Sequence, residues 1–121
     1  IVAGYTQQMH AFIESNPGLR SRFNRYLEFT DYTPGEMLEI FTRNCKKSCY
    51  ELEEAGRRAL LSYFENMTDV QRCSFGNARG VRNVFERVLS CQANRLAEKE
   101  TVSREDLMQI LMADVTAAVN P

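Results

Sequence analysis

Two clusters of arginine are the residues of this sequence best suited to chemistry. The first lies in the stretch Asn-Pro-Gly-Leu-Arg-Ser-Arg-Phe, where Arg20 and Arg22 alternate with the apolar residues Leu19 and Phe23. If the apolar pair packs against a core, it holds the arginines outward, where a guanidinium can bind a phosphate through two hydrogen bonds. The alternative is a solvated turn whose arginines pair with nearby acids, because single surface arginines are common.

The second cluster is the stretch Phe-Gly-Asn-Ala-Arg-Gly-Val-Arg-Asn. Gly76 and Asn77 predict a break and a helix cap, which puts Arg79 in the first turn of the next helix. A cation is unfavourable there because the helix start carries positive partial charge, so this placement favours a bound anion such as phosphate. Arg82 could contact the same anion or pair with Glu86. The alternative is a helix start that simply tolerates the cation.

Composition and charge argue against several classes of protein. The chain has 121 residues, 44% of them hydrophobic and 26% charged, with a net charge of −1. These values predict a folded chain of about one domain and make a general nucleic-acid binder unlikely. No apolar run is long enough to span a membrane, and no GxSxG or HExxH motif is present. The four cysteines have no zinc-ligand spacing, which predicts reduced thiols in the cytoplasm and no metal site. They are Cys45, Cys49, Cys73 and Cys91.

The elements that would position the arginines fall into two parts. Over residues 1–30 we expect short strands at 1–5 and 26–29, a helix at 6–15 that Thr6 could cap, and the arginine loop between them. This part predicts the end of an α/β unit.

From residue 31 onward the pattern is helical. Thr33-Pro34-Gly35-Glu36 is a strong helix start, and Ser103 with acidic residues after it is another. Apolar periodicity predicts helices at about 51–66 and 78–97, with a less regular stretch at 67–77. The sequence therefore predicts a mainly α protein, with a four-helix module at 31–121.

Taken in order, five stretches resemble the C-terminal half of AAA+ ATPases. They are Ile-Val-Ala-Gly-Tyr, Asn-Pro-Gly-Leu-Arg-Ser-Arg-Phe, Asp-Tyr-Thr-Pro-Gly-Glu, Phe-Gly-Asn-Ala-Arg-Gly-Val-Arg-Asn and Gln-Ala-Asn-Arg-Leu. The resemblance covers nearly the whole chain and is strongest to CbbX (the red-type Rubisco activase), SpoVK and EccA. It implies that residues 1–30 are the C-terminal end of the AAA+ α/β core and that residues 31–121 are the α-helical lid.

The resemblance also implies roles for single residues. Arg22 matches the arginine finger, which reaches the γ-phosphate of ATP in the neighbouring subunit of a ring, usually a hexamer. Arg20 is the second choice. Arg79 matches sensor 2, which reaches the γ-phosphate in its own subunit. Nucleotide binding is further implied for Gly76, Asn77 and Arg82. ATP and Mg²⁺ are the implied cofactors of the parent protein, and a protein substrate to be remodelled is the implied partner.

One departure from the family pattern shapes the expected activity. The sequence has no GxxxxGK[ST] loop, the motif that cradles phosphates, and no apolar strand that ends in acidic residues. We therefore expect these residues to be a portion of a longer ATPase and to neither hydrolyse ATP nor hold a cofactor alone. The alternative function is a non-catalytic helical interaction module, either an adaptor or a nucleic-acid binder, suggested by the basic cluster at residues 20–25.

Overall fold

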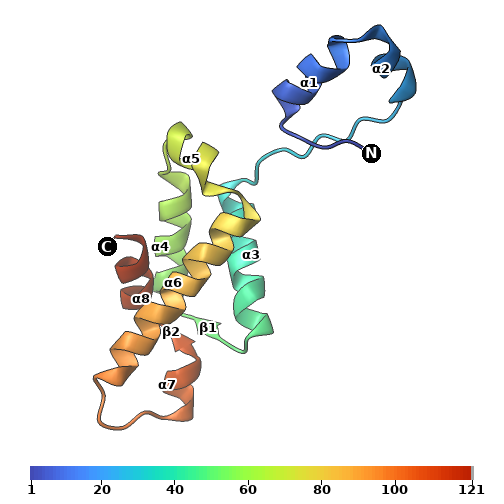
Figure 1. The fold of residues 1–121 in the computed structure, drawn as a ribbon. Helices are drawn as coiled ribbons and strands as arrows, with labels where there is room; N and C mark the ends of the chain where they lie inside the picture. Colours follow the sequence, from blue (N-terminus) through green and yellow to red (C-terminus); the bar gives the residue numbers. More distant parts are fainter. Residues whose placement is uncertain (121) are drawn as a thin grey trace. The chain divides into compact units, whose positions relative to one another are not determined.

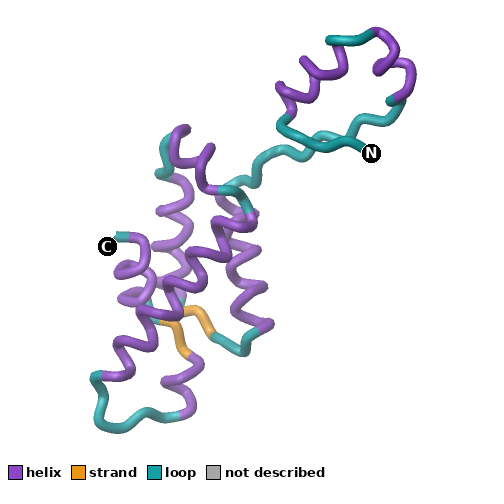
Figure 2. The backbone as a smooth tube through the Cα atoms, in the orientation of Figure 1, coloured by secondary structure: helices purple, strands orange, loops and turns teal. Residues whose placement is uncertain are grey.

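The structure, a computed structural model, describes residues 1–120 (Figure 1). It divides into two compact units, Ile1–Thr30 and Asp31–Pro121. Helices account for most of the described chain (Figure 2), which confirms the prediction of a mainly α fold. Within the described residues, no helix combines the length and the apolar character that crossing a membrane requires.

The first unit contains two helices, α1 (Thr6–Glu14) and α2 (Pro17–Arg22), which contact each other. Thr6 is the first helical residue and does not cap α1. The predicted strands at 1–5 and 26–29 are wrong, because both stretches are irregular. Alternating apolar residues do not form a strand without a neighbouring strand to pair with. Part of the predicted arginine loop is also wrong, since it folds as α2.

In the described part of the second unit, four of the helices contact one another in a closed ring (Figure 1). Helix α3 packs against α4 and α6, and α8 packs against the same two helices. Their bounds are α3 (Pro34–Lys47), α4 (Glu54–Glu65), α6 (Ala78–Ala97) and α8 (Met112–Val119). The largest fully buried side chains include Phe41, Phe64, Leu60, Ile110, Val81, Val84, Val88 and Val115. This arrangement confirms the predicted four-helix module.

Local sequence signals set two of the predicted helix starts. At α3, the Glu36 amide donates to the Thr33 hydroxyl oxygen (3.2 Å) and the Thr33 amide donates to the Glu36 carboxylate (3.0 Å). Ser103 and Asp106 make the same reciprocal pair at α7 (Arg104–Met108). Each pair satisfies amides that have no partner within the helix, so these starts were predictable from the sequence.

Three details of the second unit differ from the prediction. The stretch 67–77 contains a helix, α5 (Asp69–Phe75), which a capping box at Thr68 begins. The helix predicted from residue 51 starts at Glu54, because β1 (Glu51–Leu52) precedes it. The helix predicted from Ser103 is interrupted by β2 (Gln109–Ile110), which lies parallel to β1 with Leu52 opposite Ile110.

Two polar residues of α6 hold this interruption in place. The Gln92 side chain donates to the carbonyl oxygens of Leu107 (3.1 Å) and Gln109 (2.8 Å). Arg95 binds the buried carboxylate of Asp114 through two hydrogen bonds of 2.8 and 3.0 Å, and these bonds raise the pKa of Arg95. These residues belong to the stretch Gln-Ala-Asn-Arg-Leu, so the role that the structure gives this motif is to anchor the segment before α8.

Candidate functional site

The first arginine cluster lies on α2. Asn16 precedes this helix, and its side-chain oxygen accepts a hydrogen bond from the Gly18 amide (2.9 Å). Pro17 occupies the first position, where its missing amide hydrogen costs nothing. The turn residues Asn-Pro-Gly therefore start a six-residue helix that carries the two candidate arginines, instead of a loop.

The two arginines of α2 do not converge on one point. Successive helical residues are about 100° apart, so Arg20 and Arg22 lie about 200° apart around the axis. Arg20 is exposed, with its Nη2 atom 3.8 Å from the Glu14 carboxylate, while Arg22 is exposed and enters no ion pair within the described residues. Leu19 and Phe23 are half-buried, which agrees with the predicted anchoring role.

The second cluster begins at a tight turn between α5 and α6. Gly76 and Asn77 have φ values of 84° and 52°, and the Arg79 amide donates to the Gly76 carbonyl oxygen (3.1 Å). A Cβ atom on the buried Gly80 would lie only 2.6 Å from a ring carbon of Phe75. The first turn of α6 therefore packs directly against the end of α5, which leaves this turn little room to move.

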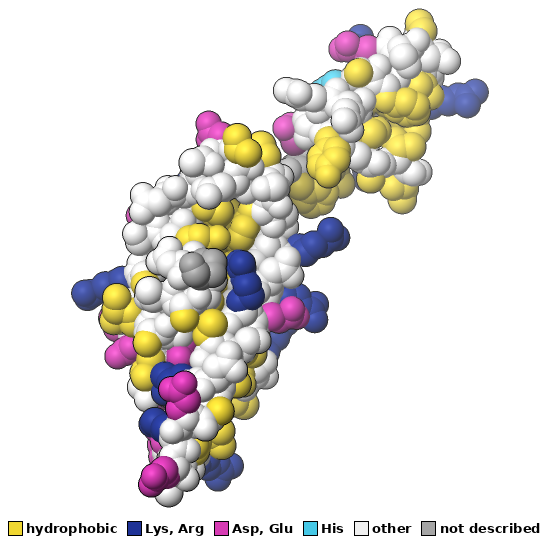
Figure 3. Space-filling view, turned by 60° about the vertical axis from the view of Figure 1, so that its left-hand side comes forward, with side chains coloured by type: hydrophobic (Ala, Val, Ile, Leu, Met, Phe, Trp, Pro, Cys, Tyr) yellow, Lys and Arg dark blue, Asp and Glu magenta, His cyan; other side chains and the backbone are white. Residues whose placement is uncertain are grey.

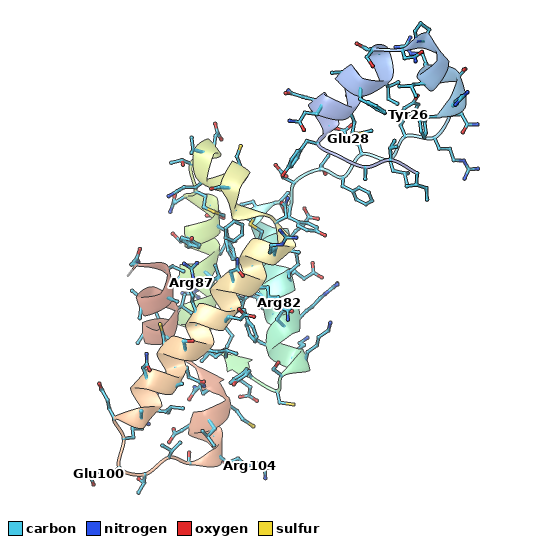
Figure 4. The ribbon with its side chains drawn as sticks, in the orientation of Figure 1. Tyr26, Glu28, Arg82, Arg87, Glu100 and Arg104 are labelled. Carbon is cyan, nitrogen blue, oxygen red and sulfur yellow. The ribbon has the colours of Figure 1, made fainter. Side chains whose placement is uncertain are left out.

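The two arginines of the second cluster differ in their neighbours. Arg79 is exposed in the first turn of α6 and enters no ion pair within residues 1–120. Arg82 has its Nε atom 3.6 Å from the Glu86 carboxylate, and Figure 4 shows its place on α6. An exposed pair of this kind contributes little to stability, but it partly neutralises Arg82. Arg79 is therefore the arginine of this cluster that is more open to an anion.

The Asn77 side chain contacts a distant segment instead of capping α6 as predicted. It precedes α6, but its side chain makes no capping hydrogen bond. Its Oδ1 atom instead accepts a hydrogen bond from the Tyr32 amide, and its Nδ2 atom donates to the Asp31 carboxylate, both at 3.0 Å. These partners lie 45 and 46 residues away in the sequence, so no local pattern points to them.

An open groove lies beside the second cluster. It has a volume of about 560 Å³ and runs along α6 where this helix passes α4 and α5. Tyr63, Phe75 and Gly80 line its apolar part, and Glu86 and Arg87 line its charged part. Among the described residues, no group of histidine, cysteine, aspartate and glutamate side chains is arranged to hold a metal ion.

Comparison with known proteins identifies the fold that presents Arg79. A family model described as the AAA lid domain matches residues 33–121. The chain belongs to the AAA lid domain family. The match confirms the resemblance found in the sequence, and it places Asn77, Arg79 and Arg82 within the lid. Arg20 and Arg22 lie before the matched residues.

Three relatives extend the comparison across almost the whole length of this chain. A CfxQ homolog of Galdieria sulphuraria is 37% identical over 95% of this chain and 38% of that protein. Stage V sporulation protein K of Bacillus subtilis is 34% identical, with shares of 96% and 36%. The chloroplastic ribulose bisphosphate carboxylase/oxygenase activase of Cyanidioschyzon merolae is 34% identical, with shares of 95% and 39%. The chain thus spans less than half the length of these relatives.

Proposed function

We propose that this chain is the C-terminal portion of an ATP-driven AAA+ ATPase that remodels a protein substrate. The single observation that carries the proposal is the lid match over residues 33–121, because it supports assigning the exposed arginine at the start of α6 to a nucleotide. Residues 1–30 are then the end of the α/β core, and residues 31–121 are the lid. The three relatives carry different names, so the substrate is proposed only as a protein.

Arg79 acts as sensor 2 in this proposal. The start of α6 carries a positive partial charge, and a cation there is unfavourable by about 0.3–1 kcal/mol until an anion approaches. The γ-phosphate of ATP removes this penalty and gains a charge-assisted hydrogen bond. Because the arginine is fixed to the lid, loss of the γ-phosphate would release the lid from the core and change their relative angle. Gly76, Asn77 and Arg82 support this contact from the same turn and helix.

Arg22 acts as the arginine finger. It is exposed on α2 and enters no ion pair among residues 1–120, which supports a contact of its guanidinium with the ATP of a neighbouring subunit. Arg20 is the second choice, because Glu14 lies beside it. Negative charge spreads over the phosphoryl oxygens during transfer, and a finger arginine that stabilises this charge accelerates related NTPases about 10³–10⁵-fold.

The partners and cofactors follow from the same proposal. ATP with Mg²⁺ supplies the phosphoryl group that is transferred, and the described residues supply arginine contacts to its phosphates. The subunits form a ring, which we propose to be a homo-hexamer. Charges of both signs are interspersed on the visible face (Figure 3) and the net charge is −1, so nucleic acid is not among the proposed partners. Four free cysteines support a cytoplasmic location.

The test is ATP hydrolysis by the complete protein that contains this chain. We expect Arg22→Ala to lower turnover about 10³-fold or more and Arg20→Ala to change it little. Arg79→Ala should lower turnover about 10²-fold, because one preorganised contact to developing charge is lost. Arg25→Ala is the matched control, since it removes an exposed arginine of the same unit and should leave turnover unchanged.

Mixing two inactive variants separates the two arginine roles. The finger serves a neighbour and sensor 2 serves its own subunit. A subunit with Arg22→Ala next to one with Arg79→Ala then has an intact sensor and receives an intact finger. Mixed rings should therefore recover part of the turnover that each variant lacks. If both single variants hydrolyse ATP at the normal rate, Arg22 is not an arginine finger and Arg79 is not sensor 2. The alternative function, a non-catalytic interaction module, then replaces the proposal.

A further inference from the structure

Asn77 has an unusual backbone conformation for a residue with a side chain. Its φ is 52° and its ψ is −119°, and it follows Gly76, whose φ is also positive. Glycine adopts such angles readily, whereas other residues pay a cost that the surrounding structure must offset. A glycine would therefore suit the turn better than asparagine. The side chain of Asn77 must offer something that a glycine lacks.

The two hydrogen bonds of Asn77 supply that difference. One end of its amide accepts from the Tyr32 backbone and the other donates to the Asp31 carboxylate, both at 3.0 Å. This pairing needs one acceptor and one donor on the same short side chain, which asparagine has and aspartate lacks. The amide does not cap α6. Its contacts serve the segment at residues 31–32 instead.

Residues 31–32 lie where the two units join, so their contact with Asn77 can transmit a displacement of the chain. Asp31 and Tyr32 are the first residues of the second unit and directly follow Thr30, the last residue of the first unit. They also precede Thr33, which caps α3. Any displacement of the chain where the two units join therefore reaches Asn77 through two hydrogen bonds, and Asn77 directly precedes α6.

We propose that Asn77 is a positioning residue that ties Arg79 to the segment joining the two units. Only Ala78 separates Asn77 from Arg79, and the backbone of this turn is held in place. The Arg79 amide donates a hydrogen bond to the Gly76 carbonyl oxygen, and Gly80 packs against Phe75. Arg79 thus moves together with residues 31–32. The inference rests on the proposed role of Arg79 as sensor 2 and adds the residue that couples it to the joint.

The variant Asn77→Gly removes the two side-chain hydrogen bonds of Asn77 without adding backbone strain. Glycine keeps the positive φ without cost, so the turn and the melting temperature should be preserved while both hydrogen bonds are lost. In the complete protein we expect this variant to lower kcat/KM for ATP about tenfold. In an Arg79→Ala background the same change should lower it less than twofold, because Asn77 acts through Arg79.

Two variants of Asp31 serve as controls for the contact with Asn77. Asp31→Ala removes one of the two bonds without touching the turn, and it should show the same dependence on Arg79 with a smaller loss. Asp31→Asn keeps an acceptor for Asn77 Nδ2 and should retain turnover. Hydrogen exchange at the Tyr32 amide should quicken in Asn77→Gly, since this amide loses its acceptor, and stay slow in Asp31→Asn.

Three results would overturn the inference. An equal loss of turnover with and without Arg79 shows that Asn77 acts independently of the arginine. No loss in Asn77→Gly, in a protein that Arg79→Ala does impair, shows that the contact positions nothing. If Arg79→Ala itself leaves turnover intact, the sensor 2 assignment of the proposed function fails and takes this inference with it. The Arg79→Ala variant alone gives this last result, so a failure of the proposed function is distinguishable from a failure of the inference about Asn77.

Discussion

The two arginine clusters of this chain are supported by very different amounts of buried structure. Arg20 and Arg22 stand on a six-residue helix in a unit where Ile13 is the single buried side chain among residues 1–30, all of which are described. Arg79 stands on a twenty-residue helix whose inner face lies in a dense core. The position of Arg79 is therefore fixed by the lid itself. We expect the position of Arg22 to depend on whatever the first unit packs against.

The largest effect should come from separating the two regions. A peptide of residues 1–30 buries too little apolar surface to fold alone, since units below about 40 residues usually need staples or partners. Residues 31–121 should unfold cooperatively at nearly the melting temperature of the whole chain. Circular dichroism on both pieces checks this. A cooperative transition in the short peptide would contradict the comparison.

Core truncation should distinguish the regions next. Phe64 is fully buried in the lid, so Phe64→Ala should lower the free energy of unfolding by about 3–5 kcal/mol. Phe12 in the first unit is 45% exposed, and Phe12→Ala should cost less than about 1 kcal/mol. Urea denaturation of the whole chain measures both. Equal losses would show that residues 1–30 contribute to the same cooperative core.

Ion pairs offer a finer comparison. Asp114→Asn leaves the Arg95 guanidinium without its buried partner and should cost about 2–3 kcal/mol. Glu14→Gln removes the exposed pair with Arg20, whose atoms are 3.8 Å apart, and should change stability by less than about 0.5 kcal/mol. Thermal melts at two salt concentrations provide the measurement. A large cost at Glu14 would mean that the first unit is more tightly held than its exposure indicates.

The smallest expected effect is a fall in the free energy of unfolding at alkaline pH. It comes from Cys45, a residue of the second unit. Burial raises the pKa of Cys45 from 9.0 to about 11. The folded state keeps this proton at pH values where the unfolded state has lost it, so stability is full below pH 9 and falls as the pH rises through 11. The loss is about 1.4 kcal/mol at pH 10, and the pKa difference limits it to about 2.7 kcal/mol above pH 11.

Comparison with a variant isolates this alkaline effect. Cys45→Ala removes the titrating thiol and should flatten the fall in unfolding free energy between pH 9 and 11, although its stability at pH 7 will be lower because of the cavity. All four cysteines lie beyond residue 30. An identical pH profile in both proteins would show that Cys45 is not the group responsible.

Local signals explain what the sequence predicted correctly. The start of α3 follows from a threonine cap with glutamate three residues later, and the span of α6 follows from the apolar period at Val81, Val84 and Val88. The same kind of signal was available for α5, because Thr68 and Gln71 form a capping box. The sequence therefore contains the signal from which the start of α5 can be predicted.

Non-local contacts explain what the sequence did not predict. The break before α8 depends on Gln92, which holds two carbonyl oxygens from residues 15 and 17 positions later. The partners of Asn77 lie even further away, so its expected role as a cap was a reasonable local prediction that distant residues changed. The roles of Arg22 and Arg79 stay predictions that the ATPase measurements test.

The place of α8 in the ring of helices has a consequence for biosynthesis. Ile110, Val115 and Ala118 are buried in the lid core, and ribosomes make them after the core residues of α3, α4 and α6. Until they emerge from the exit tunnel, the parts of α4 and α6 that α8 covers stay exposed. A nascent chain stalled before residue 110 would therefore expose a surface that chaperones bind, and the lid would close only after residues 110–118 have left the tunnel.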